Sequence, residues 1–186
     1  RLMATHEAMK AAKDRHRAVP AQLYGRVAHS IKDTIFSITQ QHQGGEPMTA
    51  VLIVRTAEED AVLGTVALAR GLSRQQPVTV LFVGEALAAM HESTFRWSES
   101  FKGRDARAAI VRAAERYDLP FADRDRDHRW SDVRGLVAWA AAQHNVRVVA
   151  CPIWCTLLGL AAPPANLDAV DESELADVLS GADLVV

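Results

Sequence analysis

The feature that most constrains the fold is an alternation, across residues 49–186, of short apolar runs with longer helical stretches. Three runs are rich in Val, Leu and other apolar residues and are too short for a helix: 50–54, 78–83 and 146–150. A shorter run covers 184–186. Continuous apolar runs of this kind are typical of strands that are buried on both faces, as in a parallel sheet.

Helices are expected between these runs, at 63–72, 107–117, 133–144 and 172–179. The acidic residues 58–60 suit the beginning of the first helix, where negative charge complements the helix dipole. Strands that alternate with helices form βαβ units. The pattern therefore predicts an α/β fold: an open, mostly parallel sheet of about four to five strands with helices on both faces.

Residues 1–47 differ from the rest of the chain. They carry seven basic and four acidic residues, a net charge of +3, which leaves −5 for the remainder. Two helices are expected, over about 6–18 and 22–42, and Glu46-Pro47 is expected to be a linker. The second helix has a stripe of apolar residues on one face: Leu23, Val27, Ile31, Ile35 and Ile38. We therefore predict a helical N-terminal extension over 1–47 and an α/β domain over 48–186, with the stripe packed on that domain or against a partner.

Charge and composition exclude several classes of protein. The chain has 21 basic and 23 acidic residues, which argues against a strongly basic nucleic-acid-binding protein. Two cysteines cannot form a disulfide scaffold. No apolar run reaches the roughly 18 residues of a membrane span. The chain does not open with a charged and then apolar leader, so the expected location is cytoplasmic.

The stretch 91–132 contains three arginines that alternate with three aspartates over 123–129. A near-neutral charge run of this kind predicts a solvated loop. The alternative is a lid beside the functional site, whose arginines contact an anionic group.

The best candidates for chemistry are two cysteines in the stretch 148–160. A predicted strand runs directly into Cys151, and Pro152 suits the first position of a helix. Cys151 is therefore expected at or near the helix N-cap, where the helix dipole and free N–H groups stabilise an anion. A thiol there is expected to have a lowered pKa and to supply the thiolate that attacks sulfur electrophiles or carries a persulfide. Cys155 is expected one turn further on, on the same face.

Other interpretations of the cysteines stay open. Both thiols would be inert core residues if buried, because free cysteine is among the most buried residue types. A zinc site needs two further ligands. His91, His128 and His144 are available, but no His-x-x-His motif or second cysteine pair accompanies them, so no metal is expected. The first strand is followed by residues 55–60 and not by a Gly-x-Gly-x-x-Gly motif, and no Gly-x-Ser-x-Gly motif occurs. No cofactor is therefore expected.

The order of these segments resembles the DsrE/DsrF-like (TusD-like) sulfur-relay family over about Thr49 to Val186. The resemblance is carried by four stretches: Ala67–Leu72, Val78–Gly84, Val149–Cys151 leading to Leu158-Gly159-Leu160, and Ala182–Val186. Residues 91–132 are longer than the usual connection in the family, and residues 1–47 have no counterpart in it.

The resemblance implies that Cys151 is the persulfide carrier in sulfur transfer, with Cys155 matching a second cysteine that some members have. It also implies a homo-oligomer, such as a trimer or hexamer, that exchanges sulfur with a donor or acceptor protein. The first hypothesis is therefore a sulfur carrier or sulfurtransferase. The alternatives are a non-catalytic oligomeric scaffold, with helix 22–42 as its working surface, and a thiol redox sensor that uses the Cys151/Cys155 pair.

Overall fold

A computed structural model describes residues 49–101, 103, 105, 116–120 and 133–186. The chain divides between Glu46 and Pro47, and all of the described residues belong to the second unit. The helices expected over 6–18 and 22–42, the linker at 46–47 and the charge run at 123–129 lie outside the described residues. So does nearly all of the helix expected over 107–117.

The core of the domain is a five-stranded sheet in which every strand pair is parallel, in the order β4-β3-β2-β1-β5. This arrangement confirms the predicted fold class. The strands are β1 (Ala50–Val54), β2 (Val78–Phe82), β3 (Val146–Ala150), β4 (Asp168–Ala169) and β5 (Leu184–Val185). The three long strands pair over their full lengths, with Ala50 opposite Val78 and Val78 opposite Val146.

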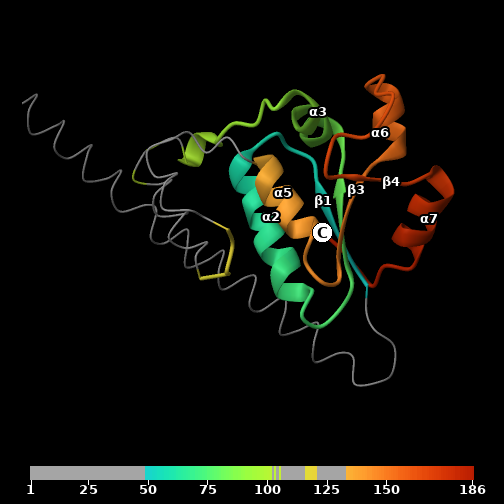
Figure 1. Cartoon of the computed structure of the whole chain (residues 1–186), viewed down its shortest axis with the longest axis horizontal. Helices are drawn as coiled ribbons and strands as arrows, with labels where there is room; N and C mark the ends of the chain where they lie inside the picture. Colours follow the sequence, from blue (N-terminus) through green and yellow to red (C-terminus); the bar gives the residue numbers. More distant parts are fainter. Residues whose placement is uncertain (1–48, 102, 104, 106–115, 121–132) are drawn as a thin grey trace, which may run out of the picture. The chain divides into compact units, whose positions relative to one another are not determined.

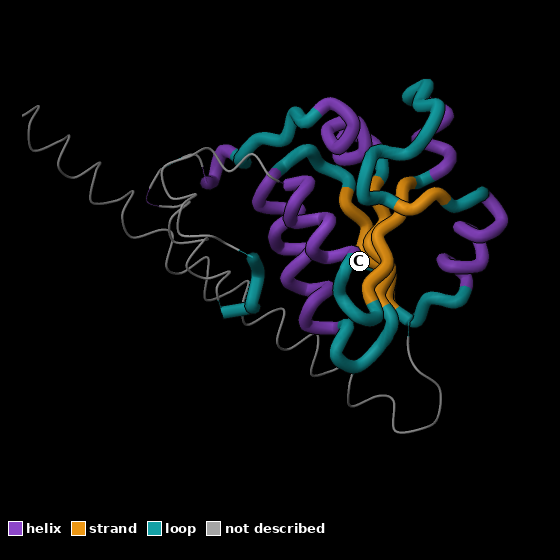
Figure 2. Tube along the Cα trace, in the orientation of Figure 1, coloured by secondary structure: helices purple, strands orange, loops and turns teal. Residues whose placement is uncertain are grey.

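Helices cover both faces of this sheet and one of its ends. They are α2 (Glu59–Leu72), α3 (Gly84–Glu92), α5 (Val133–Ala141), α6 (Pro152–Leu157) and α7 (Glu172–Ser180), with a short 3-10 helix, η1, at Glu99–Phe101. Figures 1 and 2 show α2 and α5 side by side on one face and α7 on the other. Helices α3 and α6 lie beyond the carboxyl ends of the strands (Figure 1). None of the helices in the described ranges is long and apolar enough to cross a membrane.

The alternation of side chains along each strand divides the core into two layers. Val51, Leu81 and Val149 point to the α7 side, where they form a buried cluster with Leu175 of α7. Their neighbours along the strands, such as Leu52, point to the α2 and α5 side. Because both layers are buried, the long strands are apolar at nearly every position.

The structure also sets the bounds of one predicted helix and adds elements that the sequence did not indicate. Helix α2 begins at Glu59, as the acidic residues 58–60 indicated, so it extends one turn before the apolar stretch that starts at 63. The sequence does not predict helix α3, because a glycine after an apolar run indicates only the end of a strand. Strand β4 was not predicted because it has two residues, both exposed, and therefore leaves no apolar signature.

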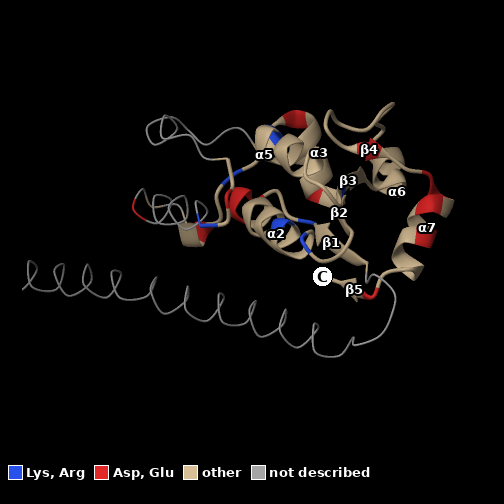
Figure 3. Ribbon diagram, turned by 60° about the horizontal axis from the view of Figure 1, so that its bottom comes forward, with Lys and Arg blue, Asp and Glu red and all other residues tan. Residues whose placement is uncertain are grey.

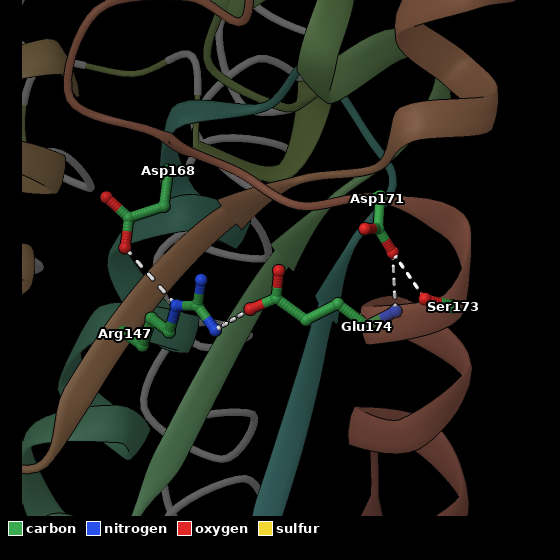
Figure 4. A network of polar contacts seen from close by, with 5 residues as sticks. All are labelled: Arg147, Asp168, Asp171, Ser173 and Glu174. Carbon is green, nitrogen blue, oxygen red and sulfur yellow. Dashed lines mark hydrogen bonds and ion pairs between the residues drawn. The ribbon is translucent and has the colours of Figure 1, made fainter.

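A network of polar contacts joins α7 to the edge of the sheet (Figure 4). Arg147 of β3 donates from Nη1 to Glu174 Oε1 of α7 at 2.6 Å and from Nε to Asp168 Oδ2 of β4 at 3.3 Å. The pKa of Arg147 is raised, chiefly by the hydrogen bond to Glu174. Asp171 caps α7, because its side chain accepts hydrogen bonds from the Glu174 N–H and the Ser173 hydroxyl, both at 2.8 Å.

The Asp171 cap makes α7 sensitive to acid. The pKa of this carboxyl lies below its ordinary value of 3.8, chiefly because the Glu174 N–H donates to the carboxylate. The cap therefore contributes its full stabilisation above that value and loses it as the pH falls through the folded-state pKa. We expect the thermal midpoint of Asp171→Asn, which retains a capping oxygen but does not titrate, to fall less on acidification than that of the wild type. If the thermal midpoints of the wild type and Asp171→Asn fell equally on acidification, the assignment of Asp171 as the acid-sensitive cap would be contradicted.

Gly84 occupies a backbone conformation that only glycine adopts without strain, with φ of +54°. We expect Gly84→Ala to lower the free energy of unfolding by about 1–2 kcal/mol, the cost of a left-handed residue with a Cβ. Gly71 is the matched control: it lies in α2, and a Cβ there meets nothing within 4 Å. Gly71→Ala should stabilise the fold by up to about 1 kcal/mol through helix propensity. Urea denaturation measures the free energy of unfolding of both variants. If the two substitutions changed it equally, the left-handed backbone at Gly84 would not be the cause.

Candidate functional site

Cys151 connects the end of β3 to the beginning of α6. Its N–H donates to the Phe82 carbonyl of β2 at 3.1 Å, and its own carbonyl accepts from the Cys155 N–H at 2.9 Å. Cys151 is the N-cap of α6, with extended backbone angles, and Pro152 occupies the first turn. The predicted N-cap position of Cys151 is therefore confirmed.

The environment of the Cys151 side chain is apolar. The residue is 5% exposed and belongs to the buried cluster of Val51, Leu81, Val149 and Leu175. Its thiol makes no capping hydrogen bond to the N–H groups of α6. Because buried structural cysteines react slowly, this burial favours the interpretation of Cys151 as a core residue. A reactive thiolate at this position stays a prediction.

Cys155 lies one turn further along α6 and is half-buried. Burial raises the pKa of the Cys155 thiol, and the neighbouring Cys151 raises it further. The Cys155 N–H donates to the Cys151 carbonyl at 2.9 Å, so the structure places the two cysteines that the sequence singled out one helical turn apart. Cys155 is the more accessible of the pair, but its thiol is harder to ionise than an ordinary cysteine.

The end of α6 explains the Leu158-Gly159-Leu160 motif. Gly159 has φ of +67°, and its N–H donates to the Thr156 carbonyl at 3.1 Å. The Leu160 N–H donates to the Cys155 carbonyl at 2.9 Å. These two bonds form a Schellman motif, in which a left-handed residue satisfies the last carbonyls of a helix. The motif fixes the backbone of Cys155 from the carboxyl end of the helix.

Residues from three strand ends meet beside the cysteines. Arg55 follows β1, Gly84 follows β2, and Trp154 belongs to α6 after β3. A Cβ atom at position 84 would lie 3.7 Å from Trp154 Cζ2 and 3.9 Å from the Arg55 carbonyl, so the indole lies over the beginning of α3. The sequence did not reveal this contact. The available signal was a glycine directly after a buried strand.

The loop after β1 is fixed by the segment that follows α3. Asp60 accepts hydrogen bonds from the Ser98 N–H and hydroxyl, both at 2.9 Å. The Arg96 N–H donates to the Ala57 carbonyl at 3.1 Å, and Trp97 is 7% exposed. The described start of the 91–132 stretch is therefore packed, although no apolar periodicity in the sequence indicates an element there.

Helix α6 itself has no buried residue. Four of its apolar residues and C-terminal neighbours are exposed: Ile153 at 50%, Trp154 at 38%, Leu157 at 68% and Leu158 at 38%. We call these four residues the α6 apolar patch. Within the described ranges, no group of three or more His, Cys, Asp and Glu side chains lies close enough together to hold a metal ion.

Neither protein-family models nor curated proteins match this chain. The resemblance to the DsrE/DsrF-like family therefore stays a prediction.

The two thiols are expected to differ in alkylation by iodoacetamide. Cys155 should be labelled first, because Cys151 is buried. Because the pKa of Cys155 is raised above its ordinary value of 9.0, its labelling rate should still increase with pH above that value. Cys151→Ser removes one cause of the raised pKa and should shift the rate profile of Cys155 to lower pH. Peptide mapping by mass spectrometry measures both rates, and faster labelling of Cys151 would contradict the burial argument.

Proposed function

We propose that this domain is a sulfur carrier that uses the Cys151/Cys155 pair. The observation that supports the proposal is the placement of two free thiols one helical turn apart at the carboxyl end of β3, one of them accessible and the other buried. Ligands of open α/β sheets bind at this edge, outside the carboxyl ends of the strands. The resemblance to a sulfur-relay family points to the same residues.

In the proposed reaction, Cys155 is the thiol that a donor reaches first. Its thiolate attacks the outer sulfur of a donor persulfide, R–S–SH. A new S–S bond forms on Cys155, the S–S bond of the donor breaks, and the donor leaves as the thiolate RS⁻. In the second step the Cys151 thiol loses its proton, and its thiolate attacks the outer sulfur of the Cys155 persulfide. An S–S bond forms on Cys151, the S–S bond on Cys155 breaks, and Cys155 takes up the proton as it leaves as a thiol. No external oxidant or reductant is consumed in either step.

Burial gives the two cysteines different tasks in this scheme. A persulfide on Cys151 is protected from water and from other thiols by the side chains around it, including Leu175 of α7. Exchange with a protein partner takes place at Cys155. Because the pKa of Cys155 is raised, transfer should accelerate as the pH rises through the neutral and mildly alkaline range.

Intact-protein mass after exposure to cysteine persulfide tests the carrier function. The wild type is expected to gain one sulfur atom. Cys155→Ser should slow this gain, and Cys151→Ser should gain the atom but lose it more quickly after the donor is removed. Cys151→Ala serves as a second variant, since a serine hydroxyl in an apolar cluster destabilises the fold. No gain in the wild type, or identical behaviour of all variants, would refute the proposal.

The same experiment distinguishes the two alternatives. A reversible loss of two hydrogen atoms under mild oxidant would indicate a redox sensor that forms a Cys151–Cys155 disulfide. No change in mass under either treatment would favour a non-catalytic binding protein. A specific observation favours that second candidate: Cys151 lies in the core cluster while the residues around Cys155 form an exposed apolar surface.

A homo-oligomer, implied by the family resemblance, is part of the proposal, and sedimentation velocity tests it.

A further inference from the structure

The α6 apolar patch is an apolar surface that the other described elements leave exposed, although α3 and α7 are in contact with α6. Ile153 and Leu157 are four residues apart, as are Trp154 and Leu158, so their side chains form two adjacent stripes on the helix. Leu157 is 68% exposed. Contiguous apolar surface of this kind marks interaction sites in soluble proteins, and tryptophan is enriched among the residues that contribute most to binding.

The surroundings of the patch are acidic. From Val148 to Val186 the sequence contains six acidic residues and no Lys, Arg or His. Helix α7 is in contact with α6. Three acidic residues at the N-cap of α7 and within it are exposed, and we call them the acidic rim: Asp171, Glu172 and Asp177. The ribbon in Figure 3 is coloured for acidic residues on β4 and α7 and carries no colour for basic residues on α6 or α7.

Arg147 does not neutralise the acidic rim. Its guanidinium donates to Glu174 and Asp168, which are not members of the rim. The hydrogen bonds to Asp171 come from neutral donors, the Glu174 N–H and the Ser173 hydroxyl. The helix that contacts α6 therefore carries negative charge that lacks a basic partner among the described residues of β3, β4, α6 and α7.

We propose that the α6 apolar patch and the acidic rim together bind a partner segment that carries an apolar stripe flanked by Lys or Arg residues. Such a segment would cover the patch with its apolar side chains and oppose the acidic rim with its charges. A symmetric contact with a second copy of this chain would place patch against patch and bring like charges of the two rims together. An anionic lipid surface would be repelled by the rim. The charge pattern thus selects a basic amphipathic partner.

The test uses the full chain and a synthetic amphipathic peptide in which Leu residues recur with helical spacing and Lys fills the other positions. A matched peptide has Glu in place of Lys. Fluorescence anisotropy of the labelled peptides measures affinity. We expect the Leu/Lys peptide to bind, with an affinity that falls as salt increases, and the Leu/Glu peptide not to bind.

Three variants identify the surface that binds the peptide. Leu157→Ser should reduce affinity by about tenfold or more, as expected for loss of a central apolar contact. The double variant Glu172→Gln/Asp177→Asn should reduce both the affinity and its salt dependence. Tyr117→Ser is the control, because this residue is another exposed apolar side chain, at 48%, in a different segment. Since the peptide contains no sulfur, the result is independent of the carrier function.

Several outcomes would overturn the proposal. They are absence of binding, equal binding of the two peptides, and binding that Leu157→Ser leaves unchanged. If the wild type is an oligomer that Leu157→Ser dissociates in the absence of peptide, a second copy covers the patch. If the chain sediments with phosphatidylserine vesicles and Leu157→Ser abolishes this, the patch is a lipid contact.

Discussion

The parallel pairing of β1, β2 and β3 is the constraint on which the rest of the domain depends. Five consecutive residues of each strand pair in register with the next, and both faces of the three strands are covered. Parallel pairing places all carboxyl ends at one edge of the sheet. The residues after the strands, Arg55, Gly84 and Cys151, therefore meet there although they are distant in sequence. The topology of the sheet alone therefore brings the ends of these strands together.

The helix that covers the second face of the sheet, α7, determines how exposed each thiol is. Helix α7 places Leu175 over the cluster that contains Cys151, and the helix is held to the sheet edge by Arg147. The ion pairs are partly exposed, so each contributes little, and the apolar contacts of Leu175 and its neighbours carry most of the attachment. Cys155, one turn further along α6, lies beyond this cover. The two cysteines, one helical turn apart, thus occupy very different environments.

The sequence predicted those features that depend on residues close together in the chain, such as strands and helix ends. The strands at 50–54 and 146–150 were predicted to the residue, because an apolar run buried on both faces has no polar interruptions. Pro152 indicated the beginning of α6 and so placed Cys151 at the N-cap. The burial of Cys151 was not predictable in this way, because it depends on Leu175 from a later helix. The contact of Trp154 with Gly84 was likewise hidden, since it joins the ends of two strands that the sequence separates widely.

Helix α6 is too short to be stable by itself, because a single turn or two of helix does not repay its nucleation cost. It persists because both ends are fixed: the Cys151 N–H is bound to Phe82 of β2, and the Schellman motif at Gly159 closes the other end. The exposed apolar side chains on α6 are therefore attached to a backbone that is already ordered. A partner that binds them loses less conformational entropy than one that must first order a loop. The same anchoring holds Cys155 in place beside the surface that such a partner would cover.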